Sequence, residues 1–132
     1  MDVSIVSAEA SVWQGDADLV VARSPEGEFG IMRGHIPFLA ALVPAKVSVV
    51  AEGSREEFFV SGGFLEASGP ADDYHVIVLA DDAEPLGDLD VSEARARLDD
   101  ARRQADEDAD DRSEAQLRIA MARVEIAEGR EH

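Results

Sequence analysis

The spacing of the apolar residues changes once along this 132-residue chain, near Leu86, and the change divides the chain into two regions. Before it, the sequence reads as short strand-like stretches such as "VSIVS", "KVSVVAE" and "YHVIVLAD", separated by turn residues. After it, apolar residues recur with the period of a helix. We therefore predict a mainly β plus α fold: an N-terminal antiparallel β-sandwich of about ten strands in residues 1–86, followed by a C-terminal α-helical hairpin in residues 87–132.

The turn residues of the first region agree with this prediction. Pro25 and Gly27 interrupt one pair of strand-like stretches, and Gly53 with Ser54 predicts a tight hairpin between "KVSVVAE" and "REEFFVSG". A parallel α/β architecture is not expected, because no helix-period stretch separates the strands. The pair Gly62–Gly63 is predicted to mark a bulge or a close backbone approach.

Capping residues indicate where the two helices begin. Asp90 with Glu93, and Ser113 with Gln116, have the spacing of a capping box, and Gly129 is predicted to end the second helix. Each helix carries an apolar face rich in small residues: Ala94, Leu98, Ala101 and Ala105, and then Leu117, Ala120, Met121, Val124 and Ala127. Because alanine buries little apolar area, we expect the hairpin to be only marginally attached.

The charge and composition of the chain argue against some kinds of binding partner. The formal net charge is -17, and Lys46 is the only lysine. A field of that sign repels nucleic acid and anionic lipid headgroups, so neither is expected as a partner. There is no cysteine, no secretory signal pattern and no apolar run that approaches the roughly 20 residues of a membrane span. A soluble, cytoplasmic protein is expected.

No arrangement of residues in the sequence predicts an active site. The three histidines, His35, His75 and His132, do not stand in metal-ligand spacing. The stretch "GEFGIMRGH" lacks the Gly-Lys-Ser/Thr and the following helix of a phosphate-binding loop. Ser61 lacks the flanking glycines and the strand-to-helix turn of a nucleophile elbow. We therefore expect no metal, no catalytic residue and no enzyme activity, and interpret the chain as a subunit or binding module.

Two ordered motifs carry a resemblance to a known family. "GEFGIMRGHIPFLAAL" resembles the Gly-Glu/Asp-x-Gly-Ile-x-Pro-Gly-His-x-Pro-Leu-Leu signature of the epsilon subunit of F-type ATP synthases. "FFVSGGFLEAS" followed by "VIVLADDAE" resembles the second signature of that family. Together with the helical hairpin, these motifs cover nearly the whole chain in the family's order.

The resemblance implies a rotor subunit. In this family the sandwich lies on the central stalk and binds the gamma subunit and the membrane c-ring, while the helices reach the alpha and beta subunits and inhibit ATP hydrolysis. For this chain it implies a non-catalytic subunit of a bacterial, proton-translocating enzyme that couples c-ring rotation to catalysis. The subunit would be peripheral, held at the cytoplasmic face of the membrane only through the complex.

The resemblance also assigns candidate interface residues. Glu28, Arg33, Gly34 and His35 would face the c-ring or the gamma subunit, and Arg33 replaces the proline that the family carries before Gly-His. Two simpler interpretations stay open for this stretch. The glycine at 34 can serve only to permit a turn, and the histidine can serve only to form hydrogen bonds within its loop.

Arginines of the hairpin are candidate regulatory residues. Arg95, Arg118 and Arg123 either face acidic groups on the catalytic subunits or pair with carboxylates along their own helices. Some bacterial relatives bind ATP between the helices through an Ile/Leu-Asp-x-x-Arg-Ala motif. Here Asp90 fits that motif, but Glu93 stands at its arginine position, and the next arginine comes two residues later, about 200° around the helix.

Asp90 and the three arginines are accordingly candidate nucleotide-binding residues, with ATP a candidate regulatory ligand and no other cofactor expected. Two further hypotheses remain open. The chain is an ATP-sensing sandwich and hairpin module, or it is a stand-alone β-sandwich adaptor unrelated to rotation.

Overall fold

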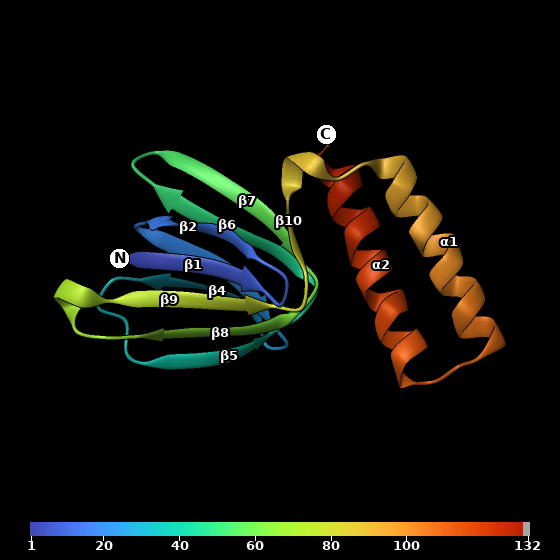
Figure 1. Cartoon of the computed structure of the whole chain (residues 1–132), viewed down its shortest axis with the longest axis horizontal. Helices are drawn as coiled ribbons and strands as arrows, with labels where there is room; N and C mark the ends of the chain where they lie inside the picture. Colours follow the sequence, from blue (N-terminus) through green and yellow to red (C-terminus); the bar gives the residue numbers. More distant parts are fainter. Residues whose placement is uncertain (131–132) are drawn as a thin grey trace. The chain divides into compact units, whose positions relative to one another are not determined.

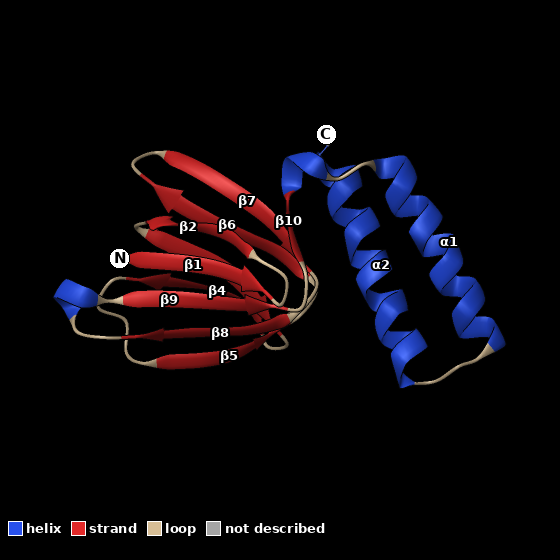
Figure 2. Ribbon diagram, in the orientation of Figure 1, coloured by secondary structure: helices blue, strands red, loops and turns tan. Residues whose placement is uncertain are grey.

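A computed structural model describes residues 1–130 of the chain as ten strands and two α-helices (Figures 1 and 2). It divides into two compact units, Met1–Pro85 and a second unit that begins at Leu86. The strands are β1 (Asp2–Ser7), β2 (Ser11–Asp16), β3 (Leu19–Ser24), β4 (Gly27–Met32), β5 (Phe38–Leu42), β6 (Ala45–Ala51), β7 (Ser54–Val60), β8 (Gly63–Ser68), β9 (His75–Ala80) and β10 (Ala83–Pro85). The helices are α1 (Val91–Glu107) and α2 (Asp111–Arg130). The predicted fold class is confirmed.

The strands form two five-stranded sheets. Sheet A has the order β2-β1-β9-β8-β5, and sheet B has the order β10-β7-β6-β3-β4. The strands β4 and β5 follow one another in the chain but are edge strands of different sheets, so residues 33–37 cross from one sheet to the other. This crossing places the loop that carries three of the predicted interface residues at an open edge of the sandwich.

One strand pair is not antiparallel. Strand β1 pairs in parallel with β9, with Asp2 opposite His75, whereas the other strand pairs in the described residues are antiparallel. A parallel pair needs a long crossover connection, which is often a helix. Here strands β2 to β8 themselves form that connection, so no helical stretch is needed.

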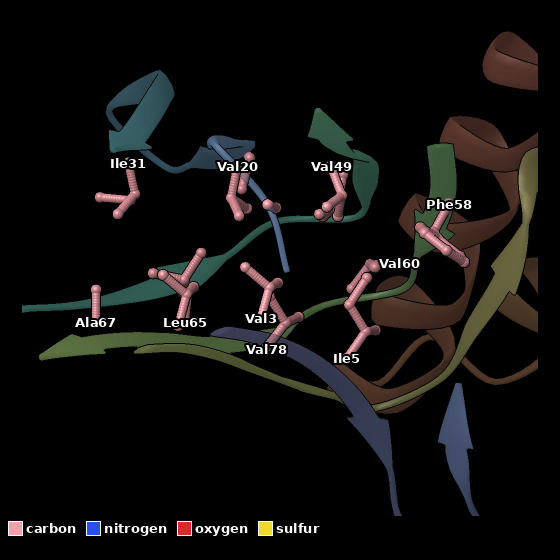
Figure 3. Close-up of a cluster of buried hydrophobic side chains, with 14 of the residues drawn as sticks. Val3, Ile5, Val20, Ile31, Val49, Phe58, Val60, Leu65, Ala67 and Val78 are labelled. Atoms are coloured by element: carbon pink, nitrogen blue, oxygen red, sulfur yellow. The ribbon is translucent and has the colours of Figure 1, made fainter. Parts of the chain in front are cut away.

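The core lies between the two sheets and is built from alternating residues of their strands. Val3, Ile5, Leu65 and Val78 reach it from sheet A, and Val20 and Val49 reach it from sheet B (Figure 3). All six side chains are at most 2 % exposed. The period-2 pattern of the first region is thus the pattern of strands with one face in the core.

Turn geometry fixes the hairpin between β6 and β7. Ala51 pairs with Ser54, so the two loop residues are Glu52 and Gly53. Both have positive φ, 47° and 79°, as a type I′ turn requires. The hairpin was predicted at this place, and its turn lies one residue earlier than the Gly53–Ser54 pair suggested.

The first predicted helix cap is present. The carboxylate of Asp90 accepts a hydrogen bond of 2.9 Å from the backbone N–H of Glu93. The side chain of Glu93 accepts a bond from Arg97 within the same helix, at 2.8 Å. The cap of α1 is therefore the Asp90 carboxylate.

The second cap is not the predicted one. Helix α2 begins at Asp111, so Asp110 is the capping residue and accepts a 2.7 Å bond from the N–H of Ser113. Ser113 lies three positions later and accepts a bond from the N–H of Asp110 through its hydroxyl, at 3.0 Å. Hydrogen bonds from the backbone N–H and the side chain of Ser113 to the Asp110 carboxyl hold its pKa below the ordinary value.

Two further predictions for α2 are wrong. The helix continues through Gly129 to Arg130, because Gly129 does not adopt the positive φ that would end it. Met121, predicted on the buried face, is 50 % exposed, whereas Arg123 is only 7 % exposed. The long aliphatic stem of an arginine can be buried in this way while its charged end reaches a polar partner.

The cap of α1 gives a first testable prediction. Replacing Asp90 by alanine should destabilise the hairpin by about 0.5–2 kcal/mol, because the N–H of Glu93 loses its acceptor. Hydrogen exchange of the α1 amides would measure this loss. Asp88→Ala is the matched control, since it removes the same charge near the same helix without removing the cap. If both variants lost the same amount of hairpin stability, Asp90 would not act as the cap of α1.

Candidate interaction surfaces

The loop between β4 and β5 is a turn held by its own backbone and by His35. Gly34 has a φ of 86°, a conformation that glycine adopts readily. The backbone N–H of His35 donates to the carbonyl oxygen of Met32 at 3.1 Å. The ring nitrogen Nδ1 lies 2.8 Å from the carbonyl oxygen of Ile36, and the ring stacks edge-on against Phe38 at 5.5 Å. The geometry favours structural roles for the glycine and the histidine.

The same turn presents a cation between two exposed apolar side chains. Arg33 is exposed and forms no ion pair with the residues that the structure describes. Met32 and Ile36 on either side of it are 62 % and 73 % exposed. An arginine flanked by exposed apolar groups is suited to a partner surface that is partly apolar and partly anionic.

Glu28 is not part of this turn. It lies near the start of β4, opposite Arg23, and its carboxylate is 3.6 Å from the Arg23 guanidinium. Strand β4 separates Glu28 from Arg33 by five residues, which is roughly 16 Å along an extended strand. The structure therefore brings Arg33, Gly34 and His35 together at one end of the sandwich and leaves Glu28 towards the other.

The outer face of sheet A carries an apolar surface that the sequence reasoning missed. We call it the apolar face, and it consists of Val6, Leu39, Ala41, Phe64, Ile77 and Leu79. In the strand register, Phe64 lies between Ala41 and Leu79, so these residues are neighbours across three strands. Leu39, Phe64 and Leu79 are each at least 53 % exposed. A contiguous patch of this kind on a sheet is typical of a docking surface.

The sequence did contain a signal for the apolar face. In "HVIVLA" apolar residues occupy successive positions, and in "GFLEAS" Phe64 directly precedes Leu65, so β9 and part of β8 carry apolar residues on both faces. A strand with one face in water alternates instead. These two strands therefore indicated a second covered face.

Glu66 interrupts the apolar face with a charge. In the register it lies between Leu39 and Ile77, and it is exposed. Glu66 forms no ion pair with another described residue. A partner that covers this face would bury the carboxylate, and a buried carboxylate needs a cation or several hydrogen-bond donors.

Sheet B differs on its outer face, where charges are paired. The Glu57 carboxylate lies 3.0 Å from Lys46 Nζ and 3.9 Å from Arg55, and it accepts a hydrogen bond from Ser48. Burial raises the pKa of Glu57, but Lys46 and Ser48 outweigh burial and hold this pKa below its ordinary value. The face of sheet A is thus the more suitable one for an apolar partner.

The hairpin arginines have three different environments. Arg95 in α1 bonds Glu128 in α2 through Nε at 3.0 Å and Nη2 at 2.8 Å. Arg118 is exposed, whereas Arg123 is buried between the helices. The fourth candidate nucleotide-binding residue, Asp90, uses its carboxylate as a cap. The structure does not gather these four residues around one empty site.

A cleft of about 710 Å³ lies between α1 and α2, towards their connecting loop. Its lining carries charges of both signs, among them Arg97, Arg112 and Arg123 against Asp100 and Glu107.

No helix in residues 1–130 is long and apolar enough to cross a bilayer.

Known proteins are similar to this chain over nearly its whole length. The family model described as ATP synthase, Delta/Epsilon chain, beta-sandwich domain matches residues 1–86. The ATP synthase epsilon chain 1 of Methylococcus capsulatus is 41 % identical over 129 residues, which span 97 % of this chain and 86 % of that protein. The ATP synthase epsilon chain of Streptomyces coelicolor is 35 % identical, with 93 % of this chain and 97 % of that protein covered.

Solved structures share the fold. A chain of the Euglena gracilis mitochondrial ATP synthase, described as OSCP/F1/c-ring in rotational state 1, matches with a TM-score of 0.77 and 25 % identity, over 98 % of this chain and 80 % of that chain. A chain of the Tetrahymena thermophila mitochondrial ATP synthase, described as central stalk/c-ring, matches with a TM-score of 0.55 and 17 % identity, over 72 % and 69 %.

Proposed function

Because this chain belongs to the family of ATP synthase epsilon chains, we propose that it is a non-catalytic subunit of the central stalk of an F-type, proton-translocating ATP synthase. It couples rotation of the c-ring to catalysis, and its C-terminal helices restrain ATP hydrolysis. The observation that carries the proposal is the exposed apolar face of sheet A, which fits a sandwich that is built into a larger assembly.

We assign the two regions different partners. Residues 1–86 bind the gamma subunit and the c-ring, and residues 87–132 reach the alpha and beta subunits. The apolar face is the gamma contact, because it is the broad apolar surface of the sandwich. The turn with Arg33 meets the polar loops of the c-ring, and Glu28 contributes to a separate contact nearer the other end of β4. The descriptions of the two similar structures, which name a c-ring and a central stalk, support this assignment.

The proposed location follows from these partners. The chain sits at the cytoplasmic face of the membrane and reaches it only through the c-ring. Its charge supports this indirect attachment, since a protein of net charge -17 is repelled by anionic lipid headgroups.

A reconstitution experiment tests the regulatory role of the hairpin. The partner ATPase is combined with the full chain or with a chain that ends after Leu86, where the second unit begins. The truncated chain should bind the gamma subunit as well as the full chain does, while ATP hydrolysis by its complex is severalfold faster. Equal hydrolysis rates at equal binding would contradict inhibition by the helices.

A further inference from the structure

Among the described residues of α1 and α2, the buried ones are four alanines and Arg123. Ala94 and Ala101 in α1, and Ala120 and Ala127 in α2, are each at most 7 % exposed, and each pair is seven residues apart. Such spacing repeats one helix face along its length. Alanines allow a close approach of the helices but bury little apolar area, so apolar contacts alone hold this pair of helices weakly.

An ion pair joins the helices at the end away from their connecting loop. Arg95 and Glu128 lie next to the buried residues Ala94 and Ala127, and two hydrogen bonds run from the guanidinium to the same carboxylate oxygen. Two other ion pairs that α1 forms among the described residues, Arg97–Glu93 and Arg103–Asp100, lie within that helix.

The positions of the two charges are unfavourable for the separate helices. Arg95 lies near the start of α1, where the helix dipole favours anions, and Glu128 lies in the last turn of α2, where it favours cations. Each residue thus opposes the dipole of its own helix. The contact between the helices gives each charge a partner of opposite sign.

We propose that Arg95 and Glu128 form an electrostatic clasp that sets how often the hairpin opens, so that ionic strength controls its opening without a bound ligand. This proposal adds a mechanism to the inhibition of ATP hydrolysis proposed above, and its biological role depends on that proposed function. It can nevertheless be measured on the isolated full chain, so its failure is distinguishable from a failure of the chain to assemble or to inhibit.

Amide hydrogen exchange of the full chain measures opening. Separated helices of this length are marginal in water, so amides of α1 and α2 exchange when the hairpin opens. The variants are Arg95→Ala, Glu128→Ala and the double variant. At low salt, the double-mutant cycle should give a coupling of roughly two- to fivefold in the opening constant, the range for partly exposed ion pairs. In 1 M salt the coupling should weaken clearly, because the Debye length of about 3 Å is then no longer than the contact between the two charges.

A second pair of substitutions, Arg97→Ala and Glu128→Ala, serves as the control. Arg97 also bonds a glutamate at 2.8 Å, but within α1, so Arg97→Ala combined with Glu128→Ala should show no coupling. Absence of coupling between Arg95 and Glu128 at low salt would overturn the clasp. Millimolar ATP should leave the exchange of the unmodified chain unchanged. If ATP instead slowed exchange and Arg95→Ala abolished that effect, Arg95 would be a ligand-binding residue and the proposal would be wrong.

Discussion

Replacing Gly63 by alanine is expected to destabilise the sandwich by roughly 2–6 kcal/mol, from about 1–3 kcal/mol of backbone strain and about 1–3 kcal/mol of overpacking. Gly63 has a φ of 133°, and a Cβ built on it would overlap the carbonyl oxygen of Leu79 in β9 and lie 3.0 Å from the Cα of Ala80. Since small domains are stable by only 5–15 kcal/mol or so, the variant should melt at least 10 °C lower or fail to fold.

Gly27→Ala separates the two causes. Gly27 has nearly the same φ, 130°, but nothing lies within 4 Å of the position that its Cβ would occupy. This variant should therefore show the strain without the overlap. Thermal unfolding of both variants, followed by circular dichroism, makes the comparison. If Gly63→Ala costs no more than Gly27→Ala, the close approach of β8 to β9 has no energetic role.

Replacing Phe64 by glutamate is expected to weaken binding of the gamma subunit at least about 30-fold, the effect of losing an interface hot spot. Phe64 is 53 % exposed in the free chain and lies at the middle of the apolar face. Its burial in the complex would remove an aromatic ring from water, and a glutamate there would be buried without a partner. Titration of the purified gamma subunit against the labelled chain measures the loss.

Gln14→Glu is the matched control, because it places the same carboxylate on the outer face of sheet A but on β2, outside the apolar face. It should change binding little, while both variants keep the melting temperature of the unmodified chain. If the two variants bound gamma equally well, the apolar face would not be the contact. Binding lost in both would indicate that charge repulsion, rather than lost apolar contact, weakens the complex.

The fold could be predicted from the sequence where local chemistry determines it. Alternating β-branched residues and turn glycines predicted the strands, and Asp90 predicted the start of α1. The start of α2 was harder, because "DEDADD" offers several acidic caps and only the packing of the helix selects Asp110. The prediction for Met121 is wrong for a related reason. Helix α2 is apolar on more than one side, so its period alone does not show which side is covered.

The candidate surfaces were less predictable, because they depend on which strands become neighbours. Glu28 and Arg33 are close in sequence, and their separation became visible only when "GEFGIM" proved to be one extended strand. The apolar face needs β5, β8 and β9 side by side, an order that no local pattern specifies. A clue lay in the consecutive apolar residues of β8 and β9.

The parallel pairing of β1 with β9 has a consequence for synthesis on the ribosome. Strand β1 needs β9 as a neighbour, yet Asp2 and His75 are about 70 residues apart. At roughly 5–20 residues per second, Val3 and Ile5 stay without one of their neighbouring strands for about 4–15 s after they are made. The sandwich cannot close before its ninth strand emerges, so these core residues, which are fully buried in the folded chain, lack part of their cover for seconds during synthesis.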